Sequence, residues 1–273
     1  MYLDKENVMK IKENINENIF RGYDIRGIYP TELDDETAYT VGVGFGSYIK
    51  SIGKTTCVIG HDNRLSSPSL YEALKTGILE TGINIISLGL CTTPMYYYAC
   101  IKLQVYSGVM VTASHNPKDD NGLKFAFDEK GNCKGQEIQD FLAYIKKGDF
   151  ATGEGKVTDY DIRNDYLELF RTNLHFGPRK LKVVIDPGNG TTSIIADKIF
   201  ASLPQIEAIP IFNTSDGNFP NHHPDPCIYE NLLSLKDRVL KEHADLGIGY
   251  DGDGDRVGFI DNLGNMLEID KFM

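Results

Sequence analysis

Short apolar segments with the length of β-strands alternate with longer amphipathic segments along most of the chain. The strand-like segments lie at residues 55–60, 83–88, 107–111, 123–127, 182–185, 206–212 and 246–249. The longer segments carry apolar residues at helical spacing and lie at about residues 36–52, 68–79, 93–103, 138–145, 162–174, 191–200 and 228–239. Such alternation is typical of layered proteins in which helices connect parallel strands. We therefore predict an α/β fold of two similar layered domains, each a mixed, mostly parallel sheet between helices.

A glycine-rich stretch, Gly148–Gly155, interrupts the alternation near the middle of the chain. A chain of 273 residues is long enough for two domains that each bury a core. We therefore assign residues 1–161 to a first domain and residues 162–273 to a second. The polar residues up to about 18 are expected to form a helical or frayed lead-in, and residues 257–269 a closing hairpin. Because Met273 directly follows a strand-like run, we expect the sequence to be part of a longer protein.

Composition excludes several classes of partner. The net charge of -11 argues against binding to nucleic acid or to an anionic membrane. No apolar run approaches the roughly 20 residues of a membrane helix, and the charged segment Met1–Lys12 is neither a signal peptide nor a transit peptide. The 5 cysteines form no CxxC pair, which is typical of reduced thiols in a cytoplasmic protein. We expect a cytoplasmic protein that supplies positive charge locally if its substrate is anionic.

Three aspartates separated by single glycines, Asp251, Asp253 and Asp255, follow one strand-like segment. Carboxylates at this spacing can converge from a tight loop on one hard cation. A calcium-binding EF-hand loop is excluded, because its required Gly and Glu positions are Arg256 and Asn262 here. Three carboxylates leave coordination positions open, as expected of Mg²⁺ that is shared with a phosphate. The alternative is a solvated acidic turn.

Ser114 lies in the segment Thr112–Pro117, directly after a strand-like run. Binding sites of α/β proteins are built at strand ends. The G-x-S-x-G elbow of hydrolases is absent. A Ser-His-Asp triad is a second interpretation, although His115 would point away from Ser114 on an extended segment. A turn with a purely geometric role is a third, and a serine that carries a phosphoryl group is a fourth.

A phosphoryl group on serine needs cations nearby, and Lys124, Arg26 and Arg256 are the candidates. Lys124 follows residues 121–122, an Asn-Gly pair that we predict to be a turn folding the next strand back beside the serine. A lysine that is partly buried or near another cation can have a lowered pKa and act as an acid/base. The alternatives are a surface lysine on an edge strand and, for Arg21 and Arg26, surface salt bridges.

Three further segments have two interpretations each. The segment His61–Ser67 either caps the following helix or brings Arg64 to the serine loop. Gly188–Gly190 resembles an anion-binding turn before a helix, but it lacks the Lys-Ser/Thr of a P-loop, and we favour a structural turn. His222 and His223 are of a metal-ligand type, but their proline-rich surroundings favour a rigid turn.

Together these residues resemble the α-D-phosphohexomutase superfamily, and within it the phosphomannomutase/phosphoglucomutase group. The match rests on four segments: Phe20–Gly27; Thr112–Pro117 with Asn121–Lys124; Gly217–Pro226; and Asp251–Arg256. The resemblance runs from about residue 18 to the C-terminus, and it implies a four-domain protein with a central cleft. The implied reaction moves a phosphoryl group between positions 1 and 6 of a hexose phosphate through a hexose 1,6-bisphosphate.

The resemblance also implies roles for individual residues. Ser114 would be the phosphoserine, with a serine-phosphate oxygen completing a Mg²⁺ site formed by the aspartates at 251, 253 and 255. Lys124 would be the general acid/base. Arg26 and Arg256 would stabilise the phosphoryl group in transfer, and His115 would support the loop or the phosphate. One metal with two or three cations is the equipment that phosphoryl transfer requires.

The family's sugar-recognition loop (Gly-Glu-x-Ser-Gly-His) and phosphate-gripping loop (Arg-x-Ser-x-Thr-Glu-Pro) do not occur in the chain. We therefore expect the first two domains of a mutase, lacking C-terminal domains of the same polypeptide and inactive alone. A phosphoglucosamine mutase fragment, a non-catalytic metal- or phosphate-binding module and a serine hydrolase remain open. Residues Phe20–Asp24 favour the mannose/glucose type over the glucosamine type.

Overall fold

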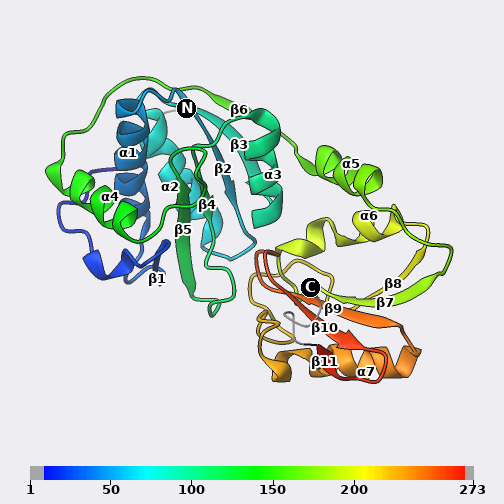
Figure 1. The fold of residues 1–273 in the computed structure, drawn as a ribbon. Helices are drawn as coiled ribbons and strands as arrows, with labels where there is room; N and C mark the ends of the chain where they lie inside the picture. The colour runs from blue at the N-terminus through cyan, green and yellow to red at the C-terminus, as the bar shows by residue number, and fades with distance from the viewer. Residues whose placement is uncertain (1–8, 268–273) are drawn as a thin grey trace, which may run out of the picture.

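The computed structural model describes residues 9–267, which form two layered α/β units (Figure 1). The strands of the first unit are β1 (Ile25–Ile28), β2 (Thr56–His61), β3 (Asn84–Leu90), β4 (Gly108–Val111), β5 (Asp120–Ala126) and β6 (Val157–Asp159). Its helices are α1 (Asp35–Ser51), α2 (Ser67–Leu79), α3 (Thr93–Leu103) and α4 (Gln136–Lys147), with a short 3-10 helix η1 (Glu17–Ile19) before them. The strand order is β1-β5-β4-β2-β3-β6, parallel from β4 to β6 and antiparallel at β5 and β1.

The second unit repeats the plan with a five-stranded sheet in the order β11-β10-β9-β7-β8. Its strands are β7 (Leu181–Asp186), β8 (Ile206–Pro210), β9 (Leu246–Tyr250), β10 (Val257–Asp261) and β11 (Met266–Leu267). Its helices are α5 (Arg163–Asn173), α6 (Ala196–Ala201) and α7 (Leu233–Glu242), with 3-10 helices η2 (Thr191–Ile194) and η3 (Tyr229–Leu232). Strands β8, β7 and β9 are parallel, and β10 and β11 are antiparallel. The predicted fold class, two layered α/β domains with mixed sheets, is confirmed.

Local chemistry explains where the main helices begin. The Asp34 carboxylate caps α1 by accepting a hydrogen bond from the Thr37 amide at 2.8 Å, and Asp35 and Glu36 occupy its first turn. Thr92 caps α3 in the same way, and Pro94 follows in the first turn. The caps fix the ends of two helices that flank the first sheet.

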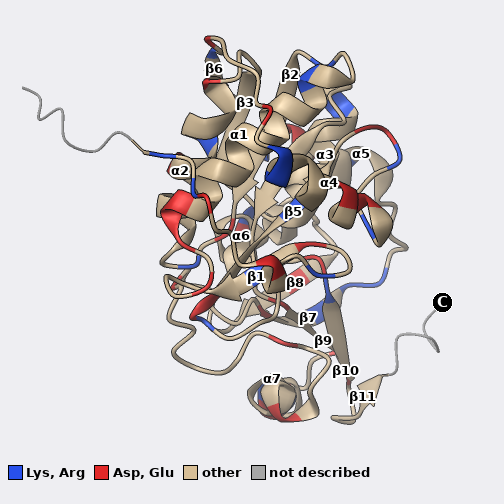
Figure 2. Cartoon of the chain, turned by 90° about the vertical axis from the view of Figure 1, so that its left-hand side faces the viewer, with Lys and Arg blue, Asp and Glu red and all other residues tan. Residues whose placement is uncertain are grey.

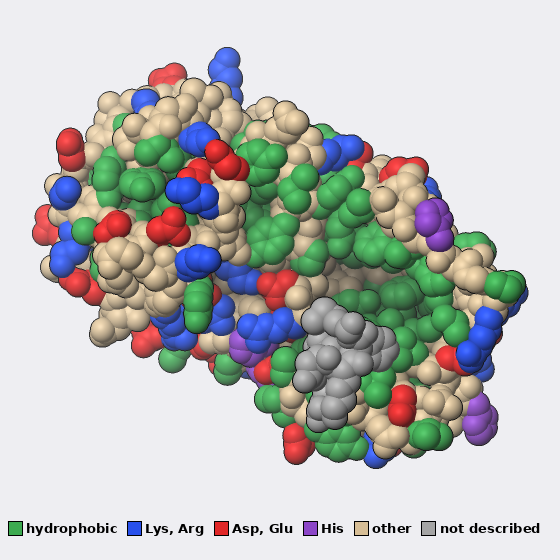
Figure 3. Space-filling model, viewed as in Figure 1, with side chains coloured by type: hydrophobic (Ala, Val, Ile, Leu, Met, Phe, Trp, Pro, Cys, Tyr) green, Lys and Arg blue, Asp and Glu red, His purple; other side chains and the backbone are tan. Residues whose placement is uncertain are grey.

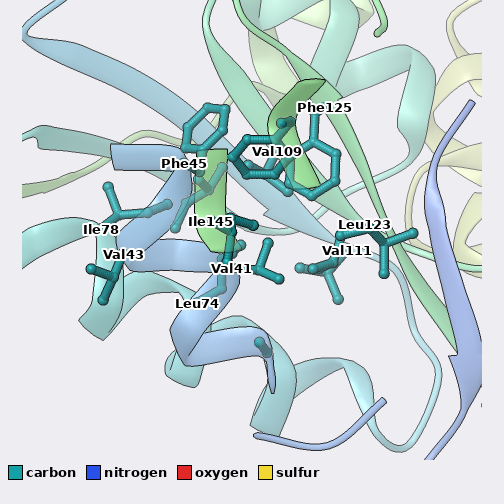
Figure 4. Close-up of a cluster of buried hydrophobic side chains, with 14 of the residues drawn as sticks. Val41, Val43, Phe45, Leu74, Ile78, Val109, Val111, Leu123, Phe125 and Ile145 are labelled. Atoms are coloured by element: carbon teal, nitrogen blue, oxygen red, sulfur yellow. The ribbon is translucent and has the colours of Figure 1, made fainter. Parts of the chain in front are cut away.

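The first core lies between the sheet and the helices α1, α2 and α4. Figure 4 shows aliphatic side chains of α1 and α2 facing those of β4 and β5, with Phe45 and Phe125 among them. Both phenylalanines are fully buried, with ring centroids 5.9 Å apart. A second cluster, with Met95 and Tyr96 of α3 and Ile199 of α6, joins the two units through one apolar core. This shared core holds the loops of the two units against each other.

The structure corrects several predicted elements. The predicted helix at 191–200 is divided at Ile195 into η2 and α6, and Ile195 is buried in the apolar cluster that the two units share. The predicted helix at 228–239 begins as η3, where Asn231 donates a side-chain hydrogen bond to the Asp225 carbonyl at 2.9 Å. Tertiary contacts override helix periodicity at both places.

Other differences concern strands and ends. Strand β6 follows the glycine-rich stretch Gly148–Gly155, where we predicted no strand, and it adds an edge to the first sheet. Strand β8 ends at Pro210, two residues before its predicted end. The predicted lead-in at residues 1–8, the hairpin residues 268–269 and the chain end at Met273 lie outside the described residues.

The surface of residues 9–267 shows two broad features. Acidic and basic residues are spread over both units (Figure 2). A hollow of about 340 Å³ lies between α5, α6 and the second sheet, and its lining is dominated by apolar side chains such as Phe170 and Phe200 (Figure 3). Among these residues, no helix has both the length and the apolar character that crossing a membrane requires. The apolar hollow has no charged residue in its lining, so chemistry that needs charged groups must lie elsewhere.

Candidate active site

Loops at the carboxyl ends of parallel strands from both sheets form one polar centre. The loop 112–119 follows β4, and the loop 251–256 follows β9. In open α/β sheets these strand ends are where ligands bind. The shared core places the two loops in contact: a Cβ on Gly252 would lie only 2.6 Å from the Ser114 carbonyl oxygen.

Ser114 is 1% exposed and adopts a left-handed backbone, with φ of 54°. A residue with a Cβ rarely takes this conformation unless its surroundings enforce it. Here the Ser114 amide donates to Thr112 Oγ1 at 2.9 Å, and an Arg64 N–H donates to the Ser114 carbonyl at 2.9 Å. The backbone is therefore fixed on both sides of the hydroxyl.

The three aspartates form a compact group of carboxylates at the end of β9. Ligand atoms of Asp251, Asp253 and Asp255 all lie within 4.8 Å of one another. Asp251 and Asp253 are buried, while Asp255 is partly exposed. The Ser114 hydroxyl donates to Asp251 Oδ2 at 3.0 Å, so the serine of the first unit meets the carboxylates of the second.

The carboxylate group fits a divalent cation. Asp253 Oδ2 accepts hydrogen bonds from Thr93, Thr112 and Lys124, while its buried Oδ1 has no hydrogen-bond partner. Buried carboxylate oxygens without donors are costly unless they coordinate a cation. Burial, and then the negative charges of the other two aspartates, raise the pKa of Asp251. An all-oxygen donor set of this kind suits Mg²⁺ or Ca²⁺.

Lys124 lies against the same carboxylates. Its Nζ is 2.9 Å from Asp253 Oδ2 and 2.8 Å from Asp255 Oδ2. Burial disfavours the charged ammonium, but the two carboxylates outweigh it and raise the pKa of Lys124 well above its ordinary value. The predicted lowering of this pKa is wrong, because the neighbours of the lysine are anions rather than another cation.

The predicted Asn-Gly turn before Lys124 is also wrong. Asn121 and Gly122 lie within β5, paired with Gly27 and Arg26 of β1. A Cβ on Gly122 would approach the Ile25 and Thr112 carbonyl oxygens to 2.5 and 2.8 Å, so this glycine permits close strand packing. The reversal of the chain occurs earlier, in the serine loop itself.

The two predicted arginines lie beside the serine loop. Arg26 is clamped by Asp24 Oδ2 and Asn116 Oδ1, both at 2.5 Å, and its buried Nε has no partner. The Arg256 guanidinium lies 3.4 Å from His115 Nε2. Both arginines therefore border the loop that carries Ser114.

His115 joins the serine to the arginines. Its Nδ1 lies 3.5 Å from Ser114 Oγ, because the left-handed serine turns the chain; the expectation that His115 points away is wrong. Burial and the charges of Arg256 and Arg26 lower the pKa of His115. Its Nε2 meets an arginine instead of a carboxylate, so these contacts do not form a Ser-His-Asp triad.

Three further residues hold the site, and the sequence brought only one of them, Arg64, to the serine loop, as one of two interpretations. Thr93 and Thr112 both donate to Asp253 Oδ2, at 2.7 and 3.1 Å. Arg64 is buried beneath the serine loop, where it donates hydrogen bonds to the Pro117 and Asp120 carbonyls. Of the two interpretations of the segment His61–Ser67, the one that brings Arg64 to the serine loop is therefore correct. Thr93 begins α3 and Thr112 follows β4, and hydroxyl side chains are so common at such positions that only the folded geometry distinguishes these threonines.

The remaining candidates have structural contacts. Asn189 is buried, with φ of 59°, and its amide group donates to the Thr214 carbonyl, as expected of a structural turn. His222 Nε2 pairs with Asp186 Oδ2 at 2.9 Å inside the proline-rich loop. Burial opposes a charged ring, yet the Asp186 carboxylate raises the pKa of His222. Arg21 has its amide bonded to the Asp24 carbonyl, which closes the turn before β1.

Comparison with known families matches both units. The family description "Phosphoglucomutase/phosphomannomutase, alpha/beta/alpha domain I" matches residues 17–152. The corresponding description of domain II matches residues 164–264. The two matches together take in both polar loops of the site.

Individual relatives agree. A phosphomannomutase/phosphoglucomutase of Pseudomonas aeruginosa is 41% identical over 256 residues, covering 94% of this chain and 55% of the relative. A phosphoglucomutase of Neisseria meningitidis serogroup B is 37% identical over 260 residues, covering 94% of this chain and 56% of the relative. The chain thus spans a little over half the length of these curated relatives.

A solved structure shows the same fold. The crystal structure of a phosphoglucomutase/phosphomannomutase family protein from Burkholderia thailandensis superimposes with a TM-score of 0.88 and 35% identity, covering 96% of this chain and 57% of that one. The chain therefore belongs to the phosphoglucomutase/phosphomannomutase family of the α-D-phosphohexomutase superfamily, and its two units are domains I and II of that family.

Proposed function

We propose that this chain carries the phosphoryl-transfer site of a phosphohexomutase that interconverts hexose 1-phosphate and hexose 6-phosphate. The observation that carries the proposal is the 3.0 Å hydrogen bond between Ser114 Oγ and Asp251 Oδ2, which joins a serine of domain I to the carboxylates of domain II. We place the boundary between the domains at residues 161 and 162. The relatives named for phosphomannose and phosphoglucose chemistry support the same reaction class.

In the proposed reaction, Ser114 exchanges a phosphoryl group with the sugar. A bond forms between a sugar oxygen and the phosphorus as the bond from phosphorus to Ser114 Oγ breaks, giving a hexose 1,6-bisphosphate. The other phosphoryl group of the bisphosphate then returns to Ser114. Because the hydroxyl is buried and its backbone is held on both sides, little reorientation is needed at the moment of transfer.

Charged side chains carry out the proton transfer and bind the phosphoryl group in the proposed reaction. Lys124 is the proposed general acid/base: to take the proton of the attacking sugar hydroxyl and return one to the departing sugar oxygen, it must first give up its own proton, which requires Asp253 and Asp255 to be drawn away from its Nζ. Arg26 and Arg256 hold the phosphoryl oxygens, and His115 supports Ser114 from the side of Arg256. The Nε of Arg26 has no hydrogen-bond partner, but it is buried, so Arg26 must move before this donor can bind an incoming oxygen.

Mg²⁺ is the proposed cofactor, held by Asp251, Asp253, Asp255 and the side chain of Ser114. When bound, it would neutralise negative charge on the phosphoryl group. The unsatisfied Asp253 Oδ1 and the raised pKa of Asp251 support a site of this charge. The proposed partners are hexose phosphate, hexose 1,6-bisphosphate and the C-terminal part of the relatives, to which we assign the choice of sugar. We therefore propose that residues 1–273 alone turn over slowly or not at all.

The proposal also places the protein in the cytoplasm, where its 5 unpaired cysteines would remain reduced.

The proposal is tested by phosphate transfer to Ser114. A longer protein that contains this chain and the C-terminal domains is incubated with ³²P-labelled glucose 1,6-bisphosphate and Mg²⁺, and the label is located by mass spectrometry of peptides. We expect label on Ser114, no label in a Ser114→Ala variant, and at least about a hundredfold slower labelling in excess EDTA. Absence of label from Ser114 while Mg²⁺ still binds would favour the non-catalytic module over the mutase.

A further inference from the structure

Arg64 is a fully buried arginine beneath the Ser114 loop, and it lies in the segment that links β2 to α2. Its Nε donates to Asp62 Oδ2 at 3.2 Å. One terminal nitrogen donates to the Pro117 and Asp120 carbonyls at 2.6 and 3.0 Å, and the other to the Ser114 and Asn116 carbonyls at 2.9 and 2.8 Å. A guanidinium has five N–H groups, so every donor of Arg64 is in use.

This saturation separates Arg64 from the other arginines of the site. Arg26 keeps a buried Nε without a partner, whereas Arg64 has no donor left for a phosphate. Its charge is balanced by Asp62, which also accepts from the Arg64 amide at 3.1 Å and from the Ser67 hydroxyl. Arg64 therefore contacts only protein groups, and any effect on chemistry must pass through the loop that it holds.

The four carbonyls that Arg64 binds span the whole chain reversal from Ser114 to β5. The Ser114 carbonyl is the decisive one, because the serine has a φ of 54° that its own side chain disfavours. A lysine carries three donors on one nitrogen and lacks the planar fork, so it cannot bind five acceptors at once. The conformation of the nucleophilic serine thus depends on this guanidinium.

Domain II closes over the other side of Arg64. The Phe219 ring lies with its centroid 5.5 Å from the guanidinium carbon, in cation–π range. Gly217 packs so closely on residues 63–65 that a Cβ would lie 2.4 Å from the Asn63 carbonyl oxygen. Domain II thus reaches the serine loop in two ways: directly, through Asp251 and Gly252, and indirectly, through the Arg64 side chain.

We propose that Arg64 is a positioning residue that holds Ser114 in its left-handed conformation and links that conformation to the docking of domain II. The inference rests on the proposed function for its catalytic consequence. It assigns Arg64 no contact with the sugar phosphate.

The test compares the wild-type chain with Arg64→Lys and with Arg163→Lys. Arg163 is the matched control, an exposed arginine at the start of α5 that pairs with Asp161. Hydrogen exchange is followed by mass spectrometry in peptides covering residues 112–122. We expect exchange to accelerate at least about tenfold in Arg64→Lys and to stay within twofold in the control, because several charge-assisted hydrogen bonds are lost only in the former. Unchanged exchange in a folded Arg64→Lys chain overturns the proposal.

A kinetic readout distinguishes positioning from substrate binding. In labelling with glucose 1,6-bisphosphate, we expect the maximal rate at Ser114 to fall at least about tenfold in Arg64→Lys while the half-saturating concentration stays within about threefold. A raised half-saturating concentration with an unchanged maximal rate would show substrate contact and overturn the proposal. The labelling uses the longer protein that contains the C-terminal domains. If its wild type takes no label, the proposed function fails, while the exchange measurement still decides whether Arg64 holds the loop.

A second variant covers the case in which Arg64→Lys does not fold. Phe219→Leu removes the ring from domain II but leaves all five hydrogen bonds of the guanidinium. We expect exchange in residues 112–122 to rise about threefold, with peptides of β2 and β4 unchanged. Equal exchange in wild type and Phe219→Leu contradicts the link between domain II and the serine loop.

Discussion

Asp251 accepts the Ser114 hydroxyl while lying against two further carboxylates, and its protonation is coupled to folding. Burial and the charges of Asp253 and Asp255 raise its pKa in the folded chain above the ordinary value near 4. Above roughly pH 4 the folded state then binds more protons than the unfolded state, so this group makes stability fall as pH rises. A bound divalent cation would reduce the repulsion between these three carboxylates.

Removing the charge of Asp251 is expected to stabilise the metal-free chain. In EDTA, Asp251→Asn should unfold at a higher free energy than wild type by at least about 1 kcal/mol at pH 7.5, and the difference should shrink toward pH 4.5. Urea titrations across this pH range measure the difference. In saturating Mg²⁺ we expect the order to reverse, because the wild type gains binding energy that the variant lacks.

Asp261 is a carboxylate whose effect on the pH dependence of stability is opposite to that of Asp251. The pKa of Asp261 is lowered by hydrogen bonds from Asn265 and from neighbouring amides in the β10–β11 turn. Its contribution to stability is present above the unfolded pKa and is lost as pH falls, so Asp261→Asn should destabilise the chain at neutral pH. A pH-independent gain in Asp251→Asn would contradict our account of the carboxylate group.

The residues of the site were largely predictable from the sequence, whereas their protonation was not. The spacing of the three aspartates indicates a cation site, whereas the residues around Ser114 left several interpretations open and only the family resemblance implied a phosphoserine. The pKa of Lys124 depends on which charges folding brings to it, and those come from a loop more than a hundred residues away. Arg64 and Thr112 act on the site through hydrogen bonds to carbonyls and carboxylates, which leave no pattern in the sequence.

At the level of elements, the loop 251–256 is shaped by the glycine that faces domain I. Gly252 has no room for a side chain, since a Cβ would lie 2.6 Å from the Ser114 carbonyl oxygen, the same oxygen that Arg64 binds. Its own carbonyl accepts the Thr191 amide at 2.8 Å, which anchors the loop from behind. Neither neighbour can move without disturbing the site.

Gly252→Ala is therefore expected to destabilise the chain by about 1–3 kcal/mol, as overpacking does. It should also slow labelling of Ser114, because the serine carbonyl must shift to admit the methyl group. Chemical denaturation and the labelling assay measure the two effects. Gly22→Ala is the control, since a Cβ there has nothing within 4 Å, and equal behaviour of the two variants would refute the argument.

The pattern of strands and helices was predictable wherever apolar periodicity decided the structure, as in α1 and β2. Prediction from periodicity failed where tertiary contacts determined the local structure. Ile195 breaks a periodic helix because its flanking residues serve the domain contact, and Val157–Asp159, all exposed, form a strand only because β3 offers a free edge. Asn121 and Gly122 look like a turn but are drawn into β5 by pairing with β1.

The whole molecule is held together by apolar contacts between its domains. Tyr96 of α3 and Ile199 of α6 belong to one buried cluster, and Asn63 donates hydrogen bonds to Asn189 and Ser215 across the same boundary. Domains that share a core lose much of it when either one unfolds. Their stabilities are therefore coupled.

We expect residues 1–273 to unfold in one cooperative thermal transition, with calorimetric and van 't Hoff enthalpies in agreement. Differential scanning calorimetry in EDTA measures this without a contribution from bound metal. Ile199→Ala should lower the stability by about 2–4 kcal/mol by opening a cavity in the shared cluster. Two resolved transitions in the wild type would show that the domains unfold independently.

The contact between Gly252 and the Ser114 carbonyl also bears on how the chain is made. A ribosome releases the serine loop and the strands of the first sheet well before the loop 251–256 emerges, and domains fold in the order of synthesis. Until then Ser114 lacks its hydrogen bond to Asp251, and Phe219 of the second domain does not yet pack on Arg64 beneath the serine loop. The site around the serine that we propose as the nucleophile is therefore complete only when the second domain has packed on the first.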